Sequence, residues 1–255
     1  MTSPALRHRQ KKLAQIAAEQ AGIAASAGLA PDMPGDGPVG TEYRQLLASL
    51  HEDLRVLHTI QSKEAKAVKK ADLITTYLPW IEGALAIEED AAAPQDEIVI
   101  TMMIWAVDIR DWDLAERLAA HVLAHNLQMP ERFHRGAAGY VVSEAAKAAL
   151  DTPGSVPHDV LERIEPLSEP PHDMTDEIRA RLQRVLGESF ARLADAFDPT
   201  VESATAGGKP ALIEKALSCL KRALELDDKV GVKKPIEQLE REAKKLAEAA
   251  AAQQT

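Results

Sequence analysis

Two histidines and three aspartates have the residue types and the spacing that metal chemistry needs. His121 and His125 lie four residues apart, which places both imidazoles on one face of a helix, where they could hold zinc. Asp108, Asp111 and Asp113 offer the carboxylate oxygens that Mg²⁺ prefers. However, the glutamate usual beside the first histidine is missing, and aspartates recur in turns for structural reasons. We therefore expect the histidines at a surface or boundary rather than on zinc, and Mg²⁺ only if the chain is itself a nuclease.

A nuclease active site is not evident in the sequence. The letters of a PD-(D/E)xK motif occur at Pro31-Asp32 and at Glu64-Ala-Lys66, but that chemistry needs its carboxylates and lysine on neighbouring strands. The first pair stands in a stretch rich in Gly and Pro, and the second lies in a helical pattern. The catalytic residues are therefore unknown, with the three aspartates above as the only candidates.

Eight basic side chains are the candidates for contacting DNA. Four stand in the first 20 residues, and four more recur in a later helix, three of them on one face at i, i+3 and i+7. They are Arg7, Arg9, Lys11 and Lys12, followed by Lys63, Lys66, Lys69 and Lys70. Lysine mostly holds phosphates, so this stripe would position DNA rather than read its sequence. The alternative is an ordinary solvated lysine face.

The charge of the chain is unevenly distributed. The formal net charge is -10, which by itself does not suit nucleic acid. The acid is concentrated in residues 84–204, whereas both candidate DNA-binding segments lie before them. Such asymmetry suits a protein with one end on DNA and the other on a protein partner, although an acidic helical protein with a basic leader is the alternative.

The elements that position these residues are predicted to be helices throughout. Hydrophobic residues make up 45% of the chain and aromatic residues only 4%, and strand-like alternation is missing. Residues 98–130 form two stretches of helical periodicity around a polar break, which predicts an antiparallel helical hairpin at the centre of an all-α fold. The single cysteine, Cys219, excludes an internal disulfide framework. With neither a signal peptide nor an apolar run of about 18 residues, we expect a soluble intracellular protein without a membrane partner.

Composition and periodicity divide the chain into seven segments. We expect a basic N-terminal arm at 1–20 with too few large apolar residues to bury much, a flexible linker at 21–40, a helical DNA-binding region at 41–95, the central helical hairpin at 96–150, a linker with one short helix at 151–175, a C-terminal helical hairpin that oligomerises at 176–247, and an Ala-rich tail at 248–255.

A weak internal repeat relates the two hairpins. Small and apolar residues in the second helix of each follow the same spacing, which permits close helix pairing. They are Ala115, Leu118, Ala119, Val122 and Leu123, and then Ala216, Cys219, Leu220, Ala223 and Leu224. The hairpins resemble tetratricopeptide-type repeats, which usually bind proteins or assemble with their own copies.

Several short segments, in order, carry a family resemblance. They are MTSPALRH at 1–8, SKEAKAVKK at 62–70, LPW at 78–80, DEI at 96–98, MMIW at 102–105, the stretch 115–130 that ends in LQMP, VGVKK at 230–234 and IEQLERE at 236–242. Together they resemble the terminase small subunit of peduovirus-type tailed phages, which is often labelled the terminase endonuclease subunit. Relatives can end in a Lys/Arg-rich tail that this Ala-rich C-terminus lacks, so DNA binding assigned to such a tail is not carried over.

The resemblance implies a function in viral DNA packaging. It implies a protein of the host cytoplasm that assembles as a homo-oligomeric ring, binds double-stranded phage DNA at the cohesive-end packaging site, and assists a large ATPase subunit in cutting and packaging. Because no active site is evident, the recognition subunit is the preferred interpretation. A true endonuclease and a helical scaffold that binds only proteins are the two alternatives.

Overall fold

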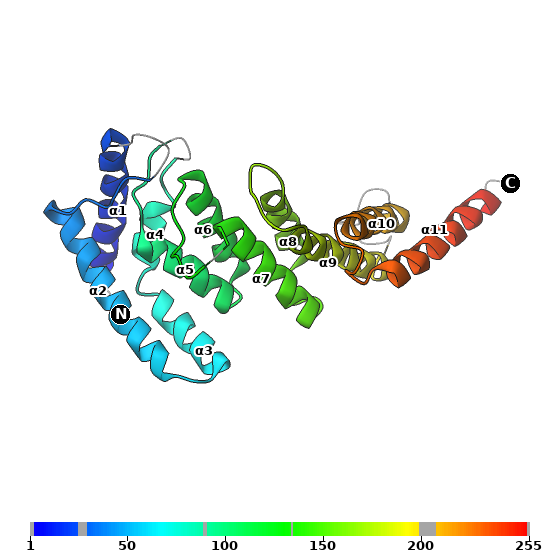
Figure 1. Ribbon diagram of the computed structural model, residues 1–255, viewed down its shortest axis with the longest axis horizontal. Coiled ribbons are helices and arrows are strands. Elements are labelled where there is room, and N and C mark those ends of the chain that lie inside the picture. The colour runs from blue at the N-terminus through cyan, green and yellow to red at the C-terminus, as the bar shows by residue number, and fades with distance from the viewer. Residues whose placement is uncertain (1–2, 25–29, 89–90, 134, 199–207, 254–255) are drawn as a thin grey trace. The chain divides into compact units, whose positions relative to one another are not determined.

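The computed structural model of the chain is helical, as Figure 1 shows. It describes residues 3–24, 30–88, 91–133, 135–198 and 208–253, and within these ranges it contains no strand. The all-α prediction is confirmed, whereas the comparison with tetratricopeptide repeats stays untested. The chain divides into two compact units, Met1–Ala137 and Ala138–Thr255, which are described separately. The division falls at the start of a helix inside residues 96–150, so the segment predicted as one hairpin region crosses it.

The first unit is built around one buried helix. Its helices are α1 (Pro4–Ala24), α2 (Gly37–Thr59), α3 (Lys63–Ile74), α4 (Leu78–Ala84), α5 (Glu97–Asp108) and α6 (Trp112–Ala124). Every residue of α5 from Ile98 to Val107 is buried, because α2, α3, α4 and α6 all pack against it. The predicted hairpin is therefore α5 and α6, joined by a three-residue turn in which Arg110 takes a left-handed conformation with φ 61°.

The start of α5 is held by a buried aspartate. Asp96 is 4% exposed and accepts hydrogen bonds from the backbone N–H groups of Ile98 (2.9 Å) and Val99 (3.1 Å), so it caps the helix. Its other oxygen accepts from Trp80 Nε1 at 2.7 Å, which ties α4 to the same point. The Tyr43 hydroxyl, from α2, accepts from the next backbone N–H, that of Glu97, at 2.9 Å. Three helices thus meet where the central helix begins.

The N-terminal arm buries more surface than its few large apolar residues led us to expect. Helix α1 packs against α4 and α2, and it buries Leu13 together with a stripe of alanines: Ala14, Ala17, Ala18 and Ala21. Gly83 of α4 permits the approach, since a Cβ there would lie 2.7 Å from the Cβ of Ala14. The prediction of little burial was wrong because it weighed only large side chains, while helices that meet through alanine and glycine approach closely enough to pack without them.

The predicted linkers are also shorter than their assigned ranges. Helix α1 continues to Ala24 and α2 begins at Gly37, so helix occupies both ends of residues 21–40, and residues 25–29 lie outside the described ranges. Residues 151–175 contain the expected short helix, α8 (His158–Ile164), followed by a 3-10 turn, η1 (Glu165–Ser168). The Ala-rich tail continues α11 as far as Gln253.

The second unit is organised by a close pair of helices. Besides α8 and η1 it comprises α7 (Ala137–Asp151), α9 (Asp176–Asp195), α10 (Gly208–Leu226) and α11 (Lys233–Gln253). Helices α9 and α10 pack together, α8 contacts α9, and α11 contacts α10. Gly187 makes the α9–α10 approach possible, because a Cβ at this position would lie 2.6 Å from Leu220 Cγ. Residues Ala216, Leu220 and Ala223 are fully buried in this pair, just as Ala115, Leu118 and Ala119 are in α6.

Candidate functional site

The lysine helix α3 presents its stripe toward the protein rather than straight into solvent. Lys63 is exposed, but Lys66 and Lys70 are only partly exposed, and Ile74, one turn beyond Lys70, is buried. The outward face has Val68 at its centre, 67% exposed, with exposed Glu64 and Asp72 one turn before and after it. Lys69 stands between the two faces and is also partly exposed. The lysines therefore flank the helix, and any phosphate they contact would approach from its sides.

One lysine of the stripe has a protein partner. Lys70 Nζ forms an ion pair with Asp108 Oδ2, and the two side chains are 16% and 39% exposed. The pair joins α3 to the C-terminal end of α5. It assigns a structural role to a predicted DNA-binding residue and to a predicted catalytic residue at once. Lys63, Lys66 and Lys69 form no ion pair within the described residues.

The basic residues of α1 are in part neutralised by carboxylates on neighbouring helices. Arg9 lies 3.5 Å from Glu42 of α2, and Lys11 lies 3.6 Å from Glu82 of α4. Glu42 is 3% exposed and also accepts a hydrogen bond from Gln10 at 3.1 Å. These contacts dock α1 on the unit. Of the other two candidates, Lys12 donates to Gln15 (3.0 Å) and Arg7 is exposed.

Two of the three candidate catalytic aspartates have structural partners. Asp108 pairs with Lys70, and Asp111 accepts the backbone N–H of Leu114 at 3.1 Å, which caps α6. Asp113 lies in the first turn of α6, where the helix dipole stabilises a negatively charged carboxylate. Among the described residues, no three His, Cys, Asp or Glu side chains gather as a metal-binding group.

The two histidines are buried, contrary to our prediction of a surface or boundary position. His121 and His125 are each 7% exposed, and their rings lie 4.4 Å apart, centroid to centroid. Burial, together with the neighbouring His125, lowers the pKa of His121 to about 4. His121 is therefore neutral at physiological pH. The two rings contact each other, and no third ligand gathers with them in the described part of the chain.

Asp96 is the buried ionisable group that the sequence interpretation missed. Burial raises the pKa of Asp96 to about 6, although its hydrogen bonds from Trp80 and from two backbone N–H groups act in the opposite direction. A perturbed carboxyl can mark a functional site, but this one is enclosed by the helices that it joins. Its position directly before the apolar run at 98–107 is the signal of a helix N-cap that could have identified it.

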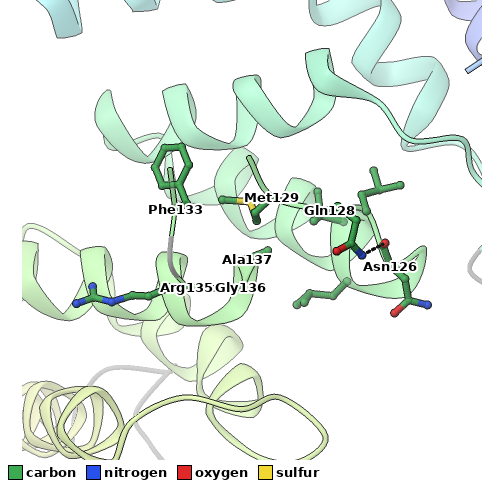
Figure 2. Close-up of a pocket in the computed structure, with 10 residues that line it drawn as sticks. Asn126, Gln128, Met129, Phe133, Arg135, Gly136 and Ala137 are labelled. Carbon is green, nitrogen blue, oxygen red and sulfur yellow. Dashed lines mark hydrogen bonds between the residues drawn. The ribbon is translucent and has the colours of Figure 1, made fainter. Parts of the chain in front are cut away.

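A pocket of about 350 Å³ lies at the C-terminal end of α6, and Figure 2 shows the residues that line it. Leu123, Met129 and Phe133 form much of its wall, and Gln128 Nε2 donates to the Asn126 carbonyl at 3.0 Å. Arg135 is the one ionisable side chain among the described lining residues. The lining mixes polar and apolar groups and holds no carboxylate or histidine among those residues, so they supply none of the groups that general acid–base chemistry most often uses.

Comparison with known proteins assigns the chain to a family. The family of the phage small terminase subunit matches residues 47–177. The chain belongs to this family. It is also 36% identical over 250 residues, covering 96% of this chain and 87% of the relative, to a protein of Escherichia phage P2 named "Terminase, endonuclease subunit". No solved structure matches the chain.

The family match identifies the chain as the small subunit of a phage DNA-packaging terminase. The matched residues include α3, the α5–α6 hairpin and α8, whereas α1, α10 and α11 lie outside them. The candidate lysines of α3 thus stand within the part of the small terminase subunit that defines the family, and the basic residues of α1 do not. Within the described residues, none of its helices is both long and apolar enough to cross a membrane.

Proposed function

We propose that this small terminase subunit binds the double-stranded DNA of the packaging site through Lys63, Lys66 and Lys69 and leaves the cutting to the large ATPase subunit. The observation that carries the proposal is the contrast within one region of the fold. Asp108 and Asp111 are engaged in an ion pair and a helix cap, while these three lysines have no ion pair among the described residues.

The second candidate function is that of an endonuclease. It is favoured by the name of the P2 relative, "Terminase, endonuclease subunit". That function would need carboxylates free to hold a divalent metal, and two of the three predicted aspartates have structural partners instead. A scaffold that binds only proteins is the third candidate. It is disfavoured because Lys63, Lys66 and Lys69 lack an ion pair among the described residues.

Binding to DNA tests the first proposal. We expect the variant Lys63→Gln/Lys66→Gln/Lys69→Gln to bind a duplex of the phage's cohesive-end region more weakly, with a salt dependence reduced by roughly 0.9 per lost phosphate contact. The matched control is Lys221→Gln/Lys244→Gln/Lys245→Gln, which removes three charges from exposed positions of the second unit. Equal affinities for the two variants would overturn the lysine assignment.

A cleavage assay separates recognition from cutting. We expect the purified small subunit with Mg²⁺ to leave packaging-site DNA intact, and the same DNA to be cut once the large subunit and ATP are added. Nicking by the small subunit alone, in a preparation free of the large subunit, would establish the endonuclease function instead.

We also propose that copies of the chain assemble as a ring on the DNA through the second unit. The support is the length of α11, whose C-terminal part continues beyond its contact with α10 (Figure 1). Native mass spectrometry of the full chain should give a closed oligomer. A monomer at micromolar concentration would contradict this assembly.

A further inference from the structure

The turn between α10 and α11 combines buried and exposed residues in alternation. Val230 is 7% exposed and Val232 is fully buried, so both anchor the turn in the core of the second unit. Lys229, Lys233 and Lys234 are exposed around them. We call residues 229–234 the basic turn. Lys229 directly precedes the first anchored valine, and Lys233 and Lys234 follow the second.

The basic turn is held in one conformation by hydrogen bonds. The Lys229 backbone N–H donates to Asp227 Oδ1 (2.9 Å), and Arg184 Nη1 of α9 donates to the Val230 carbonyl (2.8 Å). Gly231 has a φ of +85°, a left-handed conformation that favours glycine. The three lysines therefore start from fixed backbone positions, which lowers the entropy that ordering them against a ligand would cost.

The lysines of the basic turn differ in their charge environment from most basic residues of α10 and α11. Lys229, Lys233 and Lys234 have no ion pair within the described residues. Five other basic side chains of α10 and α11 have a glutamate partner, namely Lys209 with Glu242, Lys221 with Glu240, Arg222 with Glu225, Arg241 with Glu237 and Lys244 with Glu248, whereas Lys215 and Lys245 have no ion pair among the described residues.

Among the described residues, none of the nearby acids forms an ion pair with these three lysines. Asp227 is directed to the Lys229 backbone, and Asp228 is the remaining carboxylate of the turn. The first turn of α11 contains no acidic residue, although its helix dipole would favour one, and holds Lys233 and Lys234 instead. The positive end of the helix dipole repels the two lysine side chains, and a bound polyanion would offset that repulsion.

We propose that the basic turn is a second contact for the phosphate backbone of double-stranded DNA, in addition to the lysines of α3. The inference rests on the proposed function, since it assumes that the chain binds DNA. Three lysines on a fixed turn suit sequence-independent contact with successive phosphates, and the basic turn contains no arginine that would read guanine edges.

The experiment measures the affinity of the full chain for a fluorescent duplex of the cohesive-end region across a salt series. For Lys229→Gln/Lys233→Gln/Lys234→Gln we expect a dissociation constant higher by about 10- to 100-fold at about 0.1 M salt, and a log–log salt slope smaller by roughly 2 to 3. The control Lys221→Gln/Lys244→Gln/Lys245→Gln should shift both values far less. Thermal melting verifies that the variants are folded. If the triple variant is unfolded, the same DNA-binding measurement on Lys233→Gln/Lys234→Gln tests the proposal.

The outcomes separate this inference from the proposed function. Unchanged affinity and slope in the basic-turn variant, together with weakened binding in the α3 variant, would overturn the second contact and leave the proposed function intact. Failure of the unmodified chain to bind DNA at about 50 mM salt would overturn the proposed function first, and the inference with it. Normal DNA binding with lost binding of the large subunit would reassign the basic turn to a protein partner.

Discussion

Lys70 and Asp108 form an ion pair that joins the lysine helix α3 to the C-terminal end of the central helix α5. Lys70 was a candidate for contacting DNA, and Asp108 was a candidate for catalysis only if the chain were itself a nuclease. Their pairing means that each satisfies the charge of the other in a partly enclosed position. A variant at either residue should therefore change the stability of the fold more than it changes DNA-binding affinity.

The first prediction concerns this pair. Lys70→Met should lower the free energy of unfolding by about 1 kcal/mol, because Asp108 loses its partner in a half-buried position. DNA affinity should stay close to that of the unmodified chain. Lys63→Met, an exposed lysine of the same helix, should show the reverse: unchanged urea denaturation and weaker DNA binding. If Lys70→Met instead weakened DNA binding as much as Lys63→Met does, Lys70 would return to the DNA-contacting set.

The second prediction distinguishes a cap from a metal ligand. Asp111→Ala should destabilise the protein by about 1 kcal/mol, because the N–H of Leu114 loses its acceptor. Asp111→Ser should retain most of that stability, since serine also caps helices, and it should retain DNA cutting by the assembled terminase. Loss of cutting in a stable Asp111→Ser variant would show that the carboxylate does chemistry.

The third prediction concerns the pH dependence of stability. The pKa of His121 is about 4 when folded and near its ordinary value of 6.5 when unfolded, so the unfolded chain binds the extra proton between these pH values and stability falls as pH decreases through them. The pKa of Asp96 is about 6 when folded and 3.8 when unfolded, so here the folded chain binds the extra proton and stability falls as pH increases from 4 to 6. The two groups oppose each other.

Single variants should reveal how each group contributes to the pH dependence of the free energy of unfolding. In His121→Gln, the free energy of unfolding should decrease from pH 4 to pH 6 relative to the unmodified chain, because the opposing contribution of His121 is removed. In Asp96→Asn, it should instead increase from pH 4 to about 6.5, by about 2 to 3 kcal/mol. Urea titrations at several pH values measure both. Parallel pH profiles for the two variants would show that neither group titrates as its burial implies.

The fourth prediction tests the α9–α10 contact. Gly187→Ala should destabilise the second unit by about 1 to 3 kcal/mol, because the added Cβ would lie 2.6 Å from Leu220 Cγ and 3.0 Å from the Ala216 carbonyl oxygen. This outweighs the roughly 1 kcal/mol that alanine gains over glycine within a helix. Gly136→Ala is the control, since nothing lies within 4 Å of its new Cβ. A stabilised Gly187→Ala variant would show that the helices do not meet so closely.

Much of the fold could be predicted because helix signals are local. The periodicity of 98–130 predicted a hairpin, and α5 and α6 occupy it with the polar break as their turn. The docking of α1 could not be predicted in this way. It depends on alanines that bury little area singly and on Gly83, which is distant in the sequence but adjacent in the fold.

The candidate sites were predicted less well, since the function of a charged residue depends on its neighbours in space. The pair of Lys70 and Asp108 spans 38 positions of the sequence, and His121 and His125 share a helix face that is covered rather than open. By itself, the sequence determined the helical class, the central hairpin and the family resemblance, because these depend on residue order and spacing. Only the tertiary structure decided which charges are neutralised, since ion pairing and desolvation depend on through-space distance and burial.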